Sequence, residues 1–172
     1  MYIRKLTPDD MKIFREIRIK GLLTDPYAFS SSPEDDSTRD PEVLKERLNS
    51  MSVNNFILGC FINEKDPSEE LVGVVGFVRE SHIKRNHIGF IWGMYVDTAH
   101  RGKKYGDELF KKCIEEASNC EGIEIIELGV AELNIQAISL YKKYGFVEYG
   151  KEIDAIKYDG KYYNEFLMYK RI

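Results

Sequence analysis

The chain has 172 residues, of which 43% are hydrophobic and 31% charged. These values are typical of a folded domain with its own core and exclude wholesale disorder, so we expect one domain over residues 1–172. The net charge is -4 and the isoelectric point is about 5.5. This acidic balance argues against a nucleic-acid-binding protein, because such proteins present a basic surface to phosphates.

The cysteine content and the hydropathy of the chain indicate in which cellular compartment the protein is expected. Cys60, Cys113 and Cys120 form an odd set without a Cys-x-x-Cys spacing. Neither a disulfide framework nor a metal site is therefore predicted, and a reducing compartment is favoured. Residues 1–5 lack the apolar run of a signal peptide, and no stretch approaches the roughly 20 apolar residues of a membrane span. We expect a cytoplasmic protein with no membrane partner.

The first half of the chain predicts a strand, two helices and three more strands. Residues 2–6 form the first strand, and Thr7 with Pro8 opens a helix that ends before Pro26, since both residue types favour a helix start. Residues 26–40 are rich in turn-forming side chains and are predicted to form a loop. The remaining elements are a helix from residue 40 to about 50, strands 56–62 and 71–79 joined by a polar turn at 63–70, and a strand over 88–96.

The second half predicts a helix, a strand, another helix and a final hairpin. After residue 100, apolar residues recur at helical spacing while lysines and glutamates take the other face. The later elements are a strand over 123–130, a helix over 134–144 that stops at Gly145, and strands 146–157 and 161–171 around an Asp159-Gly160 turn. Strand–helix–strand crossovers place neighbouring strands in parallel, so this order predicts a mixed sheet with helices on its faces.

One segment between a strand and a helix carries candidate ligand chemistry, namely Arg101-Gly102-Lys103-Lys104-Tyr105-Gly106. A helix N-terminus offers unpaired N–H groups and the positive end of the helix dipole, which together bind anions. The glycines let a ligand approach the backbone, and the basic side chains add positive charge for a pyrophosphate. Local chemistry alone is equally compatible with a tight turn whose basic side chains are solvated.

Two familiar phosphate-binding arrangements do not fit this loop. A dinucleotide-binding fold places its glycine-rich turn after the first strand, with an acidic residue roughly 20 positions further on. Here the loop follows the fourth predicted strand, and the Gly-Lys-Ser/Thr ending of a phosphate loop is absent. The ligand is therefore expected to carry phosphates that are held in another way.

The loop and a second segment downstream together resemble the GNAT superfamily of N-acetyltransferases. The family's Arg/Gln-x-x-Gly-x-Gly/Ala signature is matched at Arg101 and Gly106, while Lys104 stands where the family usually has glycine. Residues 134–146 match every named position of the family's Asn-x-x-Ala-x-x-Leu-Tyr-x-x-x-Gly-Phe segment. The resemblance implies a single-domain α/β (α+β) fold with a mixed central sheet of about seven strands, flanked by about four helices and splayed at the central parallel strands.

The resemblance also implies acetyl-CoA as the co-substrate. The backbone of Met94, Tyr95 and Val96 would bond the pantetheine arm like an added strand. An amide near Val96 would face the thioester oxygen, and residues 101–106 would hold the pyrophosphate. Asn134 would add a contact to the pantetheine or to a bound water, although it is also a good helix N-cap.

Tyr141 is the general acid that the resemblance implies. A phenol is protonated at neutral pH and can give its proton to a departing thiolate. The alternative role of Tyr141 is to pack its ring against the sheet. The general base stays open between Glu34, Glu80 and His87, and a water chain or an amine that arrives neutral would serve as well.

The acceptor is expected to bind between residues 27–36, the first helices and the final hairpin, with Glu34 nearby and with Phe29, Trp92, Tyr162 and Tyr163 lining the site. The implied reaction moves an acetyl group from acetyl-CoA to a primary amine by direct attack in a ternary complex. A catalytically silent acyl-CoA-binding sensor and a protein-interaction module are the alternatives. The amine, the acyl length and the formation of a homodimer stay open.

Overall fold

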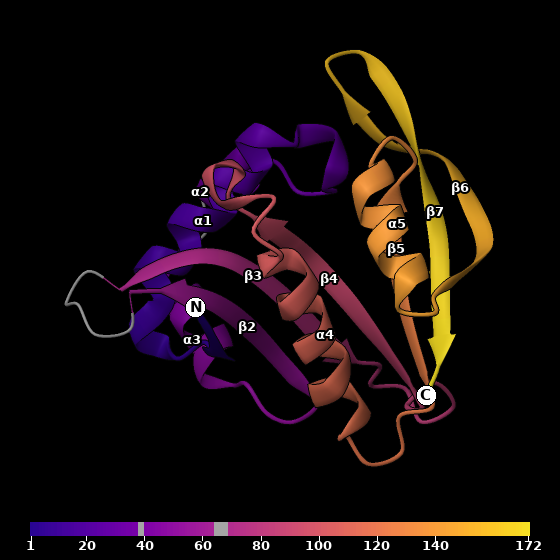
Figure 1. Ribbon diagram of the computed structural model, residues 1–172, viewed down its shortest axis with the longest axis horizontal. Coiled ribbons are helices and arrows are strands. Elements are labelled where there is room, and N and C mark those ends of the chain that lie inside the picture. Colours follow the sequence, from indigo (N-terminus) through magenta and orange to yellow (C-terminus); the bar gives the residue numbers. More distant parts are fainter. Residues whose placement is uncertain (38–39, 64–68) are drawn as a thin grey trace.

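The computed structural model describes residues 1–37, 40–63 and 69–172 (Figure 1). Within these residues, seven strands form one sheet in the order β1-β2-β3-β4-β5-β7-β6. Only β4 and β5 are parallel neighbours, and the other pairs are antiparallel. The strands are β1 (Tyr2–Lys5), β2 (Asn55–Ile62), β3 (Glu70–Arg79), β4 (Ile88–Val96), β5 (Ile125–Ala131), β6 (Val147–Tyr158) and β7 (Lys161–Arg171).

Helices cover both faces of the sheet. One face packs against α4 and α5, which contribute Phe110 and Tyr141 to the larger core, and the other packs against α1 and α3, which contribute Phe14 and Leu44. The helices are α1 (Met11–Thr24), α2 (Pro33–Ser37), α3 (Pro41–Asn49), α4 (Tyr105–Ser118) and α5 (Ile135–Lys143), with 3₁₀ turns η1 (Pro8–Asp10), η2 (Pro26–Ala28) and η3 (Thr98–His100). No helix of the described ranges is long and apolar enough to cross a bilayer.

The helix α4 anchors the loop that precedes it. Leu109, Phe110 and Cys113 recur at helical spacing and are fully buried against the sheet, which stabilises the helix by about 1.5–3 kcal/mol for each large apolar side chain. On the opposite face Lys112 and Glu116 pair at 2.9 Å. The N-terminus of α4 is therefore held at a fixed place beside the end of β4.

A bulge bends β4 at its centre. Tyr95 pairs with Val74 and Trp92 with Gly76, so two residues of β4, Gly93 and Met94, stand opposite one residue of β3. Gly93 has a φ of 62°, a conformation that other residues rarely adopt. Bulges increase local twist and re-aim the residues that follow, and this one turns the second half of β4 away from β5.

The sheet splays where β4 meets β5. Their pairing covers only Ile88–Phe90 against Ile125–Glu127, and beyond it the two strands diverge. Figure 1 shows the resulting gap between the half that carries α4 and the half that carries α5. Residues 91–96 and 128–131 thus border an opening in the middle of the sheet.

The observed architecture confirms the predicted fold class and the splayed parallel pair. The predicted loop at 26–40 differs, since it contains η2 and the short helix α2, which starts at Pro33. The first predicted helix begins with the 3₁₀ turn η1 and continues as α1. The pairing of β2 with β3 confirms the first hairpin, while residues 64–68 of its predicted turn lie outside the described residues.

Candidate functional site

A cavity of about 770 Å³ opens in the gap between β4 and β5. Its lining combines the end of β4, the loop before α4, the start of α5 and the segment around η2. Most residues that the sequence singled out meet here: Phe29, Trp92, Met94, Tyr95, Val96, Arg101, Gly102, Lys104, Tyr105, Gly106, Asn134 and Tyr141.

The loop before α4 presents a run of unpaired amides. The first backbone N–H of this helix that is bonded belongs to Glu108, which donates to the Lys104 carbonyl at 3.1 Å. In the described part of the chain, the N–H groups of residues 102–107 have no acceptor. They lie at the positive end of the helix dipole, so this part of the cavity is suited to a phosphate anion.

Lys104 adopts the left-handed conformation that its position requires. Its φ is 65° and its ψ is 9°, a region that glycine enters without cost and that other residues enter at about 1 kcal/mol or more. The side chain is exposed at the cavity rim. The lysine at this signature position thus takes the left-handed conformation that glycine enters most readily.

Gly106 lines the cavity at the first turn of α4. A methyl group at this position would lie 3.5 Å from Val96 Cγ2 and 3.6 Å from Met94 Cε, both ordinary contact distances. The protein itself could therefore accept a side chain here. The absence of one leaves space beside two residues that line the cavity.

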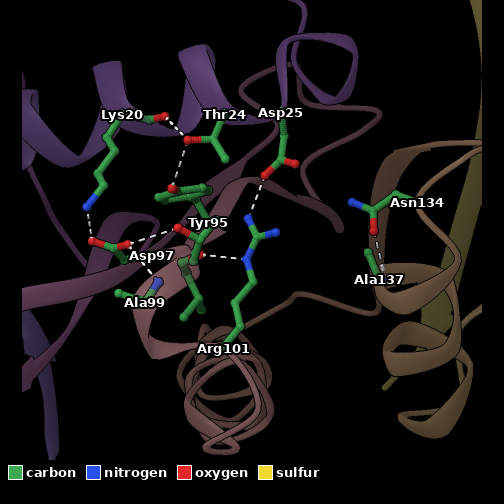
Figure 2. Close-up of polar contacts among 11 residues, drawn as sticks. Lys20, Thr24, Asp25, Tyr95, Asp97, Ala99, Arg101, Asn134 and Ala137 are labelled. Carbon is green, nitrogen blue, oxygen red and sulfur yellow. Dashed lines mark hydrogen bonds and ion pairs between the residues drawn. The ribbon is translucent and has the colours of Figure 1, made fainter.

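The Arg101 side chain turns away from the loop amides. Its Nε donates to the Val96 carbonyl at 3.0 Å, and its Nη2 pairs with Asp25 at 2.5 Å (Figure 2). The guanidinium also lies 5.6 Å from the centre of the Tyr95 ring. Arg101 therefore ties the loop to β4 and to the start of η2, and its charge is already compensated by Asp25.

Asp97 fixes the turn that leads from β4 into the loop. It is buried, accepts the Ala99 amide at 3.1 Å and forms an ion pair with Lys20 of α1 (Figure 2). Burial opposes ionisation of Asp97, but the bonds from Lys20 and Ala99 outweigh it and hold its pKa below the ordinary value. The loop is thus anchored to α1 as well as to α4.

The end of β4 offers backbone groups to the gap. Asp97 donates its N–H to the Val72 carbonyl at 2.9 Å. Because bonding direction alternates along a strand, Tyr95 also bonds toward β3, whereas Val96 turns its N–H and C=O toward β5. The Val96 carbonyl takes the Arg101 bond. Tyr95 lines the cavity, and the expectation that its backbone bonds a ligand stays a prediction.

Tyr141 projects from α5 into the base of the cavity. Its ring is buried, 4.7 Å from the ring centre of Phe110, and its hydroxyl contacts Met94 Sδ at 3.8 Å. Burial raises the pKa of the phenol, and the nearby Cys113 thiol adds a smaller effect in the same direction. Tyr141 therefore carries its proton throughout the neutral range.

Asn134 caps α5 at the opposite wall. Its Oδ1 accepts the Ala137 N–H at 3.2 Å, which confirms the N-cap interpretation. Figure 2 shows the amide nitrogen pointing into the space between α5 and Arg101. One group of this side chain thus serves the helix, and the other is available to a ligand.

Aromatic side chains lie on the side of the cavity where the acceptor is predicted to bind. Phe29 and Trp92 line the cavity, and the Arg47 guanidinium lies 4.5 Å from the centre of the Trp92 ring. Tyr163 is not in the lining, but its ring stacks on that of the lining residue Tyr27 at 5.6 Å. The predicted acceptor side is thus partly assembled around η2.

Several sequence candidates lie apart from the cavity. Glu34 is exposed on α2, and Lys103 is exposed in the loop; neither lines the cavity. Glu80 and His87 stand at the closed end of β4, where Glu80 pairs with Arg85 at 3.7 Å and the His87 carbonyl accepts from the start of β5. The structure brings none of the candidate bases Glu34, Glu80 and His87 to Tyr141.

His100 and Asp25 are cavity residues that sequence reasoning missed. His100 lies in η3, its ring centre is 6.4 Å from that of Tyr105, and its buried Nδ1 has no partner within the described ranges. No sequence signal pointed to Asp25, because its pairing with Arg101 joins residues 76 positions apart. No group of three or more His, Cys, Asp or Glu in the described ranges could hold a metal ion.

The family assignment follows from comparison with known proteins. The sequence profile described as the Acetyltransferase (GNAT) family matches residues 19–146, which include β4, the loop, α4, β5 and α5. This chain belongs to the GNAT family of acetyltransferases. The matched region contains all the elements that carry the unpaired amides, the open strand end and Tyr141.

Curated relatives of this GNAT protein agree with the assignment. An uncharacterised N-acetyltransferase of Methanocaldococcus jannaschii is 38% identical over 152 residues, covering 85% of this chain and 60% of the relative. A spermidine N(1)-acetyltransferase of Vibrio cholerae is 26% identical over 105 residues, covering 61% of this chain and 59% of the relative. The chain thus spans about 60% of the length of these two relatives.

Solved structures share the fold over the whole chain. A GNAT-family acetyltransferase of Streptococcus pneumoniae superposes with a TM-score of 0.86 at 24% identity, covering 99% of both chains. The yncA protein of Salmonella typhimurium, solved with its cofactor acetyl-CoA, superposes with a TM-score of 0.81 at 21% identity, covering 99% of this chain and 93% of that one. At these identities the likeness concerns the fold.

Proposed function

We propose that this GNAT protein is a cytoplasmic N-acetyltransferase that moves an acetyl group from acetyl-CoA to a primary amine by direct attack in a ternary complex. The observation that carries the proposal is one cavity that joins unpaired loop amides, an open strand edge and a protonated phenol. Membership in the GNAT family and the three free, buried cysteines support it.

The donor set fits acetyl-CoA. The amides of residues 102–107 suit a pyrophosphate, and the space beside Gly106 admits it close to the backbone. The strand edge at Met94 and Val96 can bond an extended amide-containing arm in the manner of an added strand. Acetyl-CoA would supply a thioester whose carbonyl carbon is open to attack by a neutral amine.

The chain's own residues supply the remaining chemistry. The Val96 N–H faces the gap, where it can stabilise negative charge on the thioester oxygen. Tyr141 holds its proton at the phenol oxygen and can deliver it to the departing sulfur. The ring of Phe110 holds Tyr141 in place. Water takes up the proton that the amine nitrogen loses.

The test has two steps. Acetyl-CoA at about 100–1000 times its Kd should raise the unfolding free energy by about 3–4 kcal/mol in a melting experiment. Release of free thiol from acetyl-CoA should then be measured with spermidine, phenethylamine, phenylalaninamide and a tetra-alanine peptide amide as acceptors. Thiol release with one of these amines supports the proposal, and the absence of any acetyl-CoA binding contradicts it.

The acyl-CoA-binding sensor is the second candidate, and one observation favours it. The two acidic residues of the cavity lining are already paired, Asp25 with Arg101 and Asp107 with Lys143. Acetyl-CoA binding without thiol release for any amine, unaffected by Tyr141→Phe, would support the sensor. A protein-interaction module would instead show no affinity for acetyl-CoA.

A further inference from the structure

The carboxylate of Glu165 on β7 lies beside Gly129, although Glu165 is not itself part of the cavity lining. Its Oε2 lies 3.4 Å, and its Oε1 3.8 Å, from the place where Gly129 would carry a Cβ. Gly129 lines the cavity. Because this position has no side chain, the carboxylate of Glu165 rests directly on the backbone of β5.

Strand register places Glu165 on the acceptor side. Glu165 pairs with Ala131, and its neighbour Phe166 points to the opposite face, into the core beneath α5. Gly129 shares the face of Glu165, because residues two apart on a strand point the same way. Glu127 shares this face of β5 and pairs with Phe90 of β4. Trp92, two residues after Phe90, therefore lies on the same face of the sheet. Glu165 and Trp92 therefore lie on the same side of the sheet.

Glu165 has no compensating partner in the ligand-free protein. Across residues 1–37, 40–63 and 69–172, no hydrogen bond or ion pair reaches its carboxylate, and its charged neighbour is another acid, Glu152 of β6. Burial is the main reason that its pKa lies above the ordinary value, and Glu152 adds to the effect. A partly buried carboxylate without a cation is costly to keep.

We propose that Glu165 is the site that binds the ammonium group of the acceptor amine, which then loses a proton to water so that the neutral nitrogen can attack. A primary ammonium would supply the hydrogen bonds and the positive charge that the carboxylate lacks, and charge-assisted bonds of this kind are the strong ones. Tyr163, whose ring stacks on that of Tyr27 in η2, precedes Glu165 by two residues near the start of β7. The inference rests on the proposed acetyltransferase function and names the group that selects its acceptor.

The experiment compares Glu165→Gln with Glu152→Gln, a matched control that removes the neighbouring exposed carboxylate. Steady-state thiol release is measured with the best amine of the panel named above. Binding of that amine and of the alcohol with the same skeleton is measured by calorimetry on protein saturated with desulfo-CoA, which cannot react. The second readout does not depend on turnover.

Glu165→Gln should raise KM for the amine on the order of tenfold or more, leave KM for acetyl-CoA unchanged, and abolish the preference for the amine over the alcohol. Glu152→Gln should change neither constant. Because Gln is isosteric and uncharged, Glu165→Gln should melt no lower than the wild type, which separates lost recognition from lost folding.

An unchanged KM and an unchanged preference in Glu165→Gln would overturn the inference while leaving the acetyltransferase proposal intact. Equal losses in Glu165→Gln and Glu152→Gln would also overturn it, since a general acidic field would then be the cause. If the wild type binds acetyl-CoA but neither binds nor acetylates any amine, the function itself fails, and the assignment of Glu165 fails with it.

Discussion

At the scale of single residues, Tyr141 combines burial with a weak polar contact. Its hydroxyl has a thioether as partner at 3.8 Å, and sulfur of this kind is a poor acceptor. The phenol is therefore held by ring packing against Phe110 and Phe146, and its O–H remains available for transfer.

Tyr141→Phe should lower kcat by about a hundredfold or more, because it removes the proton donor for the leaving sulfur. The affinity for acetyl-CoA and the melting temperature should stay close to those of the wild type, since the ring and its packing remain. Tyr144→Phe is the control, because the rings of both tyrosines contact Phe110 of α4. The Tyr144 hydroxyl, however, bonds to the Asp107 carbonyl at 3.3 Å. Equal activity of Tyr141→Phe and the wild type would remove Tyr141 from the mechanism.

At the scale of elements, the loop before α4 and the first turn of this helix hold two positions of the signature, Lys104 and Gly106. The left-handed conformation of Lys104 is energetically unfavourable for a residue with a side chain. Gly106, in the first helical turn, leaves space beside Met94 and Val96. The two positions of the signature therefore have separate purposes. One concerns the backbone course and the other concerns space for the ligand.

Lys104→Gly should stabilise the fold by up to about 1 kcal/mol and keep acetyl-CoA affinity, because glycine enters the left-handed region freely. Gly106→Ala should also stabilise the fold, by about 0.5–1 kcal/mol, since alanine favours helices. It should nevertheless weaken acetyl-CoA binding about tenfold by filling the space beside Met94 and Val96. Melting curves and calorimetric titrations measure both effects.

Gly150→Ala on β6 is the matched control for Gly106→Ala. A methyl group there would lie 3.5 Å from Leu167 Cδ1, a similar contact distance, outside the cavity lining. Its affinity for acetyl-CoA should equal that of the wild type. Unchanged affinity in Gly106→Ala would mean that the phosphates bind elsewhere.

The sequence pattern predicted the helices and strands and most of the loop residues that line the cavity, because both depend on local signals. The Asn134 cap and the Arg101–Gly106 loop are short contiguous segments, and their residue types alone indicate a helix cap and an anion-binding loop. The contacts of Asp25 and Glu165 were not predictable in this way, since they depend on strand register and on partners far along the chain. The sequence offered one signal for Glu165: it is an acidic residue on a predicted strand, on the face opposite the core residues Phe166 and Met168.

At the scale of the whole molecule, two halves meet around the gap. Besides the short pairing of β4 with β5, an aromatic cluster joins them: Phe110 of α4 lies 4.7 Å from Tyr141 and 5.6 Å from Phe146, measured between ring centres. The position of Tyr141 relative to the loop therefore depends on Phe110.

Phe110→Leu should cost about 1 kcal/mol of unfolding free energy and should also lower kcat, because the two halves lose a shared ring contact. Phe56→Leu is the matched control: Phe56 is equally buried, but it stacks on Phe77 within the half formed by β2 and β3. It should cost a similar free energy in a denaturant titration without affecting kcat. Equal losses of kcat in both variants would contradict a specific role for Phe110.

The splay of β4 from β5 also bears on how the protein behaves at high concentration. An unpaired strand edge is a template on which other chains can add and aggregate. Here the two free edges lie inside the sheet, between the halves that carry α4 and α5 (Figure 1), and the Val96 carbonyl is already taken by Arg101. The unpaired ends of β4 and β5 are thus accessible to a narrow ligand. We expect them to be inaccessible to a β-strand of a second molecule, so this edge should not promote aggregation.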